Sequence, residues 1–75
     1  MKITIKLIGS ISEQIGFSEK ELDVAEGMTI SELMVSLGVD RARPAVVTRN
    51  GLAAALADTI IAEDRVVVSP AFSGG

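Results

Sequence analysis

The sequence predicts an α+β domain in which one main helix covers one face of a mixed sheet of four or five strands. Three observations predict it. Residues 2–7 alternate polar and apolar side chains, which is the period of a half-buried strand. Residues 29–38 combine a helix-capping pattern with apolar residues at helical spacing. Residues 65–69 contain three consecutive valines, which favour a strand in the middle of a sheet.

The N-terminal part is expected to form a strand, a short helical turn and a second strand. The apolar side chains of the first strand fall on one side: Ile3, Ile5 and Leu7. Residues 11–16 suit a single helical turn, with Ser10 as its N-cap and Gly16 at its end. Residues 19–24 alternate again, and Leu22 and Val24 are predicted to face inward.

The main helix is predicted over about residues 30–37. Thr29 and Glu32 form a capping box, in which each side chain accepts a hydrogen bond from the backbone of the other residue. Gly38 is a natural C-terminal stop. The apolar residues behind the cap recur at helical spacing and define the face that packs on the sheet: Ile30, Leu33, Met34 and Leu37.

The second half is expected to add three strands. Pro44 precedes a strand over residues 45–49, and Asn50-Gly51 is a strong signal for a tight hairpin. Residues 52–55 then form a short returning strand. A turn at Glu63-Asp64 leads into the last strand, which Pro70 ends because proline has no N–H to donate.

The first and last strands are the most apolar, so the economical arrangement pairs them centrally and in parallel. The helix then crosses the sheet, which is a β-grasp, the ubiquitin-like layout. A chain of 75 residues forms one domain at most, so a single domain is expected over residues 1–75.

The composition excludes most catalytic side chains. The chain has no cysteine and no histidine, so it has no disulfide, no thiol nucleophile and no histidine base. A serine could pair with a lysine as its base, but Lys2, Lys6 and Lys20 are placed at outward strand positions. The carboxylates that a metal site would need are interpreted as a solvated face: Glu13, Glu19, Glu21, Asp23 and Glu26. We therefore expect no catalytic residue, no metal and no enzymatic activity of its own.

Charge and hydropathy indicate which kinds of partner and which cellular compartment are expected. A net charge of −3 argues against nucleic acid as a partner. The arginines Arg41, Arg43 and Arg49 are interpreted as part of a solvated loop, with a functional basic patch as the alternative. No apolar run approaches membrane-spanning length and the N-terminus lacks a signal-peptide pattern, so no membrane is expected and a cytoplasmic protein is inferred.

The last six residues, PAFSGG, are the functional tail expected from this elimination. The α-carboxylate of Gly75 is anionic at neutral pH and becomes electrophilic only if another protein converts it to an acyl-adenylate. Gly74 has no Cβ to obstruct a narrow channel, and Phe72 supplies an apolar contact. The residues from Ser73 onward are expected to be mobile in the free protein.

The sequence resembles the MoaD/ThiS family of ubiquitin-like sulfur carriers over essentially its whole length. The most specific segments are Asn50-Gly51, residues 58–61, residues 63–66 and residues 70–75. The resemblance implies that a ubiquitin-activating-like enzyme adenylates Gly75, that a thiocarboxylate forms there, and that its sulfur passes to a small precursor. It makes Gly74 the threading residue. Pro70, Ala71, Phe72 and Ser73 become the segment inserted into partners, and ATP belongs to the adenylating enzyme.

Two branches of the family remain open. The short helical segment within residues 9–16 and Pro70 favour the small subunit of molybdopterin synthase, whose partner is the synthase large subunit. The thiamin-type carrier, whose partner is thiazole synthase, is the alternative. The sequence departs from the pattern of the family at two places. Glu63-Asp64 stands where the family commonly has Gly-Asp, and Ser69-Pro70 stands where it frequently has Pro-Pro. A ubiquitin-like modifier joined to lysines through Gly75 and an interaction module with an inert tail are the further alternatives.

Overall fold

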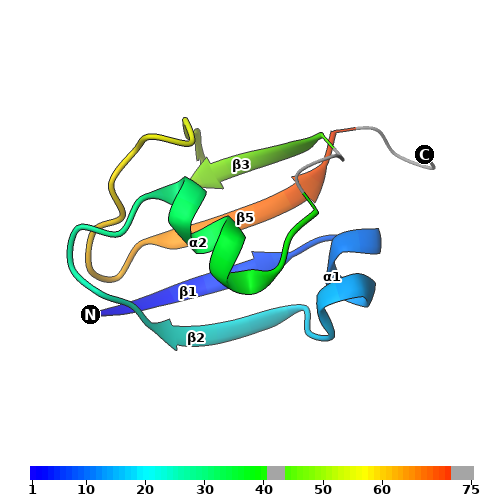
Figure 1. Ribbon diagram of the computed structural model, residues 1–75, viewed down its shortest axis with the longest axis horizontal. Helices are drawn as coiled ribbons and strands as arrows, with labels where there is room; N and C mark the ends of the chain where they lie inside the picture. Colours follow the sequence, from blue (N-terminus) through cyan, green and yellow to red (C-terminus); the bar gives the residue numbers. More distant parts are fainter. Residues whose placement is uncertain (41–43, 72–75) are drawn as a thin grey trace.

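The computed structural model describes residues 1–40 and 44–71, which form one sheet and two helices (Figure 1). Strand β1 (Lys2–Leu7) leads to helix α1 (Ser10–Ile15) and strand β2 (Glu19–Asp23). Helix α2 (Ile30–Leu37) follows. The chain then forms β3 (Ala45–Arg49), β4 (Leu52–Ala53) and β5 (Arg65–Pro70).

The five strands lie in the order β2-β1-β5-β3-β4. Strands β1 and β5 are parallel and central, with Ile5 opposite Val66 and Leu7 opposite Val68. The other pairs, β1 with β2, β3 with β5 and β3 with β4, are antiparallel. This is the predicted β-grasp, and the prediction that the valine-rich segment occupies the middle of the sheet is confirmed.

Helix α2 crosses one face of the sheet and closes the core (Figure 1). Ile30, Leu33 and Met34 are buried, whereas Leu37 is half-buried against the same core. The buried apolar residues of the sheet and its connections are Ile3, Ile5, Leu7, Ile11, Val47, Ile60, Val66 and Val68. The predicted helical face is therefore the one that packs on the sheet.

The capping box at the start of α2 is present as predicted. The Thr29 hydroxyl accepts from the Glu32 N–H at 3.2 Å, and a Glu32 carboxylate oxygen accepts from the Thr29 N–H at 3.1 Å. Gly38 ends the helix with a φ of 82°, in the left-handed region. Both helix ends follow from local sequence because the partners of each cap lie within one turn.

Two predicted boundaries were wrong. Gly9 is the N-cap of α1 and Ser10 is already helical, because a backbone with φ of 57° and ψ of −132° turns the chain there without any side-chain cap. Strand β4 has two residues, although residues 52–55 were expected. Ala55 and Asp58 explain the difference, because they exchange hydrogen bonds that fold the chain into a turn: Ala55 N–H to Asp58 Oδ2 at 2.9 Å, and Asp58 N–H to the Ala55 carbonyl at 3.0 Å.

No helix among residues 1–40 and 44–71 is long and apolar enough to cross a membrane.

Candidate functional site

The candidate site is the end of β5, where the chain leaves the sheet. Pro70 is the last residue of β5, is half-buried and lies opposite Ala45 of β3. Ala71 is exposed, and its N–H donates to the Pro44 carbonyl at 3.1 Å. The fold therefore holds the first two residues of the predicted insertion segment.

The remaining predicted site residues, Phe72, Ser73, Gly74 and Gly75, lie outside the described residues. The expectation that the chain is mobile from Ser73 onward, together with the roles assigned to Gly74 and Gly75, stays a prediction.

Helix α1 flanks the exit on the side opposite β3. Because β1 and β5 are parallel, the turn after β1 and the end of β5 lie at the same end of the sheet (Figure 1). The Ile8 N–H donates to the Val68 carbonyl at 2.9 Å. Gly9 lies against Pro70, such that a Cβ placed on this glycine would be 3.7 Å from Pro70 Cγ. The exit is thus supported from two sides.

The side chains that were excluded from chemistry are distributed as predicted in most cases. The five carboxylates interpreted as a solvated face are all exposed: Glu13, Glu19, Glu21, Asp23 and Glu26. Within the described part of the chain no three acidic residues gather into a possible metal site. The outward position predicted for Lys20 was wrong, because Lys20 lies opposite the buried Ile5 and therefore on the core face of the sheet. Its side chain is still exposed, and its Nζ lies 4.6 Å from the centre of the Phe17 ring, a cation–π contact.

The strand predicted over residues 45–49 is confirmed, and Arg49 ends β3. The expectation that the Arg49 side chain is solvated was wrong, because this side chain is only 25% exposed. Its Nε lies 2.8 Å from Asp64 Oδ2, and its Nη1 donates to the Thr59 carbonyl at 3.0 Å. Arg41 and Arg43 lie outside the described residues, so the predicted grouping of three arginines is untested for them.

Asp64 is a buried carboxylate that the sequence reasoning missed. The residue is 5% exposed, and besides Arg49 it accepts from Asn50 Nδ2 and from the Ile61 N–H, both at 2.8 Å. Asn50 Oδ1 in turn accepts from the Arg65 N–H at 2.9 Å. These bonds tie the hairpin after β3 to the turn before β5. Asn50-Gly51 signals the hairpin, but no local pattern identifies a partner 14 residues away.

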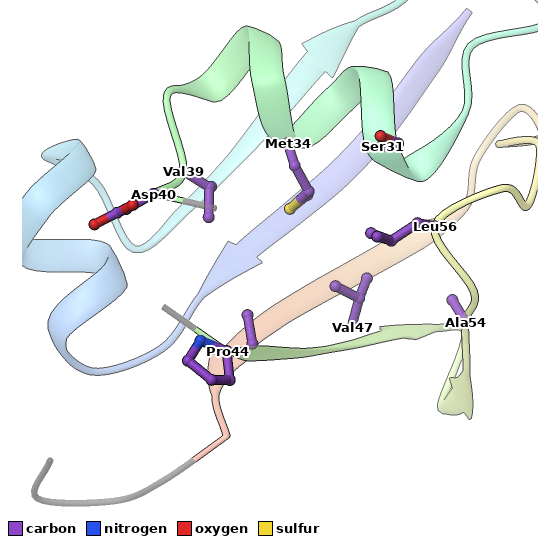
Figure 2. A pocket seen from close by; sticks show the side chains of 9 residues that line it. Ser31, Met34, Val39, Asp40, Pro44, Val47, Ala54 and Leu56 are labelled. Atoms are coloured by element: carbon purple, nitrogen blue, oxygen red, sulfur yellow. The ribbon is translucent and has the colours of Figure 1, made fainter. Parts of the chain in front are cut away.

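An apolar groove of about 390 Å³ lies between α2 and β3 and was also not predicted. Figure 2 shows Met34 of α2 and Val47 of β3 pointing toward one another across it, with Leu56 at one side. Pro44, whose carbonyl binds Ala71, lines the end of the groove nearest the exit. Leu56 is 56% exposed and forms part of its rim.

Comparisons with known proteins agree with this architecture. The sequence profile of the ThiS family matches residues 5–75. No curated protein sequence matches the chain. Among solved structures, small archaeal modifier protein 1 of Haloferax volcanii is similar over 100% of both chains, with 25% identity and a TM-score of 0.80.

Two further structures share the fold. A ubiquitin of Caldiarchaeum subterraneum is 25% identical over 100% of this chain and 98% of its own, with a TM-score of 0.64. A Pyrococcus furiosus protein provisionally assigned as molybdopterin converting factor subunit 1 has a TM-score of 0.79 and 18% identity, over 93% of this chain and 97% of its own. The profile match covers nearly the whole sequence, including β5 and the residues that follow it. The chain therefore belongs to the ThiS family of small ubiquitin-like carriers and modifiers.

Proposed function

We propose that this protein is a sulfur carrier whose Gly75 carboxylate is adenylated and then converted to a thiocarboxylate. The observation that carries the proposal is the family match, which runs to residue 75 and therefore includes the Gly-Gly sequence. The fold is compatible with it, because the tail follows a central strand and leaves at one end of the sheet. The core ends before the tail begins, at Val68.

The chemistry has two steps. A carboxylate oxygen of Gly75 attacks the α-phosphorus of ATP and releases pyrophosphate, which leaves an acyl-adenylate. Hydrosulfide (HS⁻), released by a sulfur donor, then attacks the acyl carbon, displaces AMP and loses its proton. The product thiocarboxylate keeps its sulfur terminal and exposed for transfer to a precursor. This chain contributes the acyl group, whereas ATP is held by the adenylating enzyme.

The proposed partners are a ubiquitin-activating-like enzyme and a sulfur-accepting synthase. Helix α1 supports the assignment to the molybdopterin branch, because the short helical segment between the first two strands was the feature that favoured it. The synthase partner is then the large subunit of molybdopterin synthase. The thiamin route, with thiazole synthase as acceptor, remains the alternative pathway for the same carrier chemistry.

The adenylation step is tested by ATP–pyrophosphate exchange. The protein is mixed with a purified adenylating enzyme from the same organism, ATP and labelled pyrophosphate. We expect exchange with the full chain and none after deletion of Gly75, since the reacting carboxylate would then be displaced by one residue. Gly74→Ala is expected to fold normally and to slow exchange, because a Cβ narrows the fit to the enzyme's channel. Unchanged exchange without Gly75 would contradict the proposal.

A second function is favoured by one specific observation. The similarity to small archaeal modifier protein 1 extends over 100% of both chains at 25% identity. A modifier would use the same adenylated Gly75 but would transfer its acyl group to a lysine amine of another protein. The two functions separate in the product: a thiocarboxylate on the free chain, or an isopeptide-linked conjugate of larger mass.

A further inference from the structure

The turn between β1 and α1 packs against the end of β5. Gly9 has a φ of 57°, a conformation that side-chain-bearing residues rarely adopt. Its open side faces the Pro70 ring, with Cγ and Cδ at 3.7 Å and 3.9 Å from the position a Cβ would occupy. A glycine at this position permits the sharp turn. A Cβ here would only make an ordinary van der Waals contact with the proline ring, so an alanine would be strained by its backbone and not by a clash with Pro70.

The residues around Pro70 are fixed on both sides. On the α1 side, the Ile8 N–H binds the Val68 carbonyl at 2.9 Å, and on the β3 side the Ala71 N–H binds the Pro44 carbonyl at 3.1 Å. Pro70 donates no hydrogen bond and has a restricted φ of its own. Pro70 is held by its place opposite Ala45 in the β3–β5 ladder, and the Gly9 backbone lies against its ring on the other side.

Helix α1 is itself anchored, which makes it a firm support. Ile11 is 8% exposed and belongs to the core, and the Ser12 hydroxyl and N–H both bond to the Gly9 carbonyl, at 2.8 Å and 3.1 Å. Gly9 is consequently fixed to α1, and α1 to the sheet. Gly75 lies four residues beyond Ala71, so the direction set at Pro70 limits where Gly75 can reach.

We propose that Gly9 and Pro70 are positioning residues that fix the direction in which the tail leaves the domain. The proposal rests on the proposed function, because a fixed exit direction strengthens binding only when Gly75 enters an adenylating enzyme. Ordering the backbone of one additional residue on binding reduces affinity by a factor of about 5 to 30. A domain that already holds Pro70 and Ala71 avoids that loss.

The first test needs no partner. Backbone amide order parameters and hydrogen exchange are measured for the wild-type protein, Gly9→Ala and Pro70→Ala. We expect the Ala71 amide to lose exchange protection in both variants and its order parameter to fall from about 0.85 toward 0.6, while those of Val66 and Val68 stay unchanged. Pro70→Ala removes the ring without straining the backbone at Gly9, so this variant still tests the proposal if Gly9→Ala does not fold.

Gly27→Ala is the matched control. Gly27 also has a positive φ, of 85°, but a Cβ there would meet no atom within 4 Å. This variant introduces the same kind of backbone strain away from Pro70, and it should leave the Ala71 amide unaffected. An Ala71 amide that stays fully protected in both Gly9→Ala and Pro70→Ala would overturn the proposal, as would equal loss in Gly27→Ala.

The second test measures ATP–pyrophosphate exchange with the adenylating enzyme. Gly9→Ala and Pro70→Ala should each raise KM about 5- to 30-fold with kcat within about twofold of wild type, because binding is affected and the chemical step is not. The double variant should resemble the larger single effect, since both changes disturb the same Gly9–Pro70 junction. A role confined to stability would leave KM unchanged below the unfolding temperature, and that result would refute the positioning role. If the wild-type protein shows no exchange, the proposed function fails, and the amide measurements alone decide whether Gly9 and Pro70 order the exit.

Discussion

Replacing Asp64 by alanine should destabilise the fold strongly through lost hydrogen bonds. The Asp64 carboxylate accepts from Asn50 Nδ2 and the Ile61 N–H and pairs with Arg49, all at 2.8 Å. Removing one partner of a buried ion pair costs about 3–5 kcal/mol. The Arg49 side chain is 25% exposed and keeps its bond to the Thr59 carbonyl, so part of that cost is relieved by water. We expect a loss of about 3 kcal/mol.

That loss is a large share of the total for so small a domain. A chain of 75 residues has an expected unfolding free energy of roughly 4–11 kcal/mol. A change of about 3 kcal/mol should lower Tm by roughly 12–24 °C for a domain of this size. Far-ultraviolet circular dichroism during heating measures Tm, and a guanidinium titration gives the free energy with its slope as a check on two-state unfolding.

Glu19→Ala provides the matched control, because it removes a second carboxylate–arginine pair from the same protein. Glu19 and Arg65 are joined at 3.1 Å, but their side chains are 52% and 48% exposed. Exposed pairs contribute about 0–1 kcal/mol, and added salt weakens them. Equal losses of unfolding free energy in Asp64→Ala and Glu19→Ala, or a Tm unchanged by Asp64→Ala, would refute the reasoning. Burial and several hydrogen-bond donors would then not make Asp64 a stabilising residue.

Three other changes give independent checks. Leu33→Ala should lower the unfolding free energy by about 2–5 kcal/mol in a guanidinium titration, because Leu33 is 1% exposed. Val35 lies on the same helix but is 57% exposed, so Val35→Ala should cost about 0.5 kcal/mol or less. Similar losses at the two positions would mean that α2 packs through another face. Thr29→Ala should cost about 1 kcal/mol in the same titration by removing the helix cap, and no loss would show that the capping box does not stabilise α2. Phe72→Ala should weaken binding to the adenylating enzyme in calorimetry while leaving Tm unchanged, and unaltered affinity would remove the apolar seat proposed for the tail.

The elements that could be predicted are those whose determinants are local. Thr29 and Glu32 are three residues apart, and Asn50 and Gly51 are adjacent, with φ values of 53° and 84°. The central position of β5 followed from its three consecutive valines, because a strand without a polar face is typical of the middle of a sheet. These signals combine consistently, and the order of elements then leaves few topologies to choose from.

What could not be predicted depends on residues brought together by the fold. Arg49 was placed in a solvated loop because its charge alone favours solvent, and only the folded chain brings Asp64 to it. Strand β4 is shorter than expected because the Ala55 N–H donates a hydrogen bond to Asp58 Oδ2, which folds the chain into a turn. The packing of Gly9 against Pro70 could not be predicted either, because the two residues are far apart in the sequence. The groove beside α2 depends on spacing between a helix and a strand, which sequence patterns do not specify.

The mass of the C-terminal peptide tests the central claim most directly. The protein is incubated with the adenylating enzyme, ATP and a sulfur donor, and the intact chain and its C-terminal peptide are then weighed by mass spectrometry. A sulfur carrier gains the mass difference between one sulfur and one oxygen atom, confined to the peptide that contains Gly75. A chain that stays at its original mass under these conditions, or that is recovered only as a conjugate to lysines of other proteins, would contradict the carrier assignment.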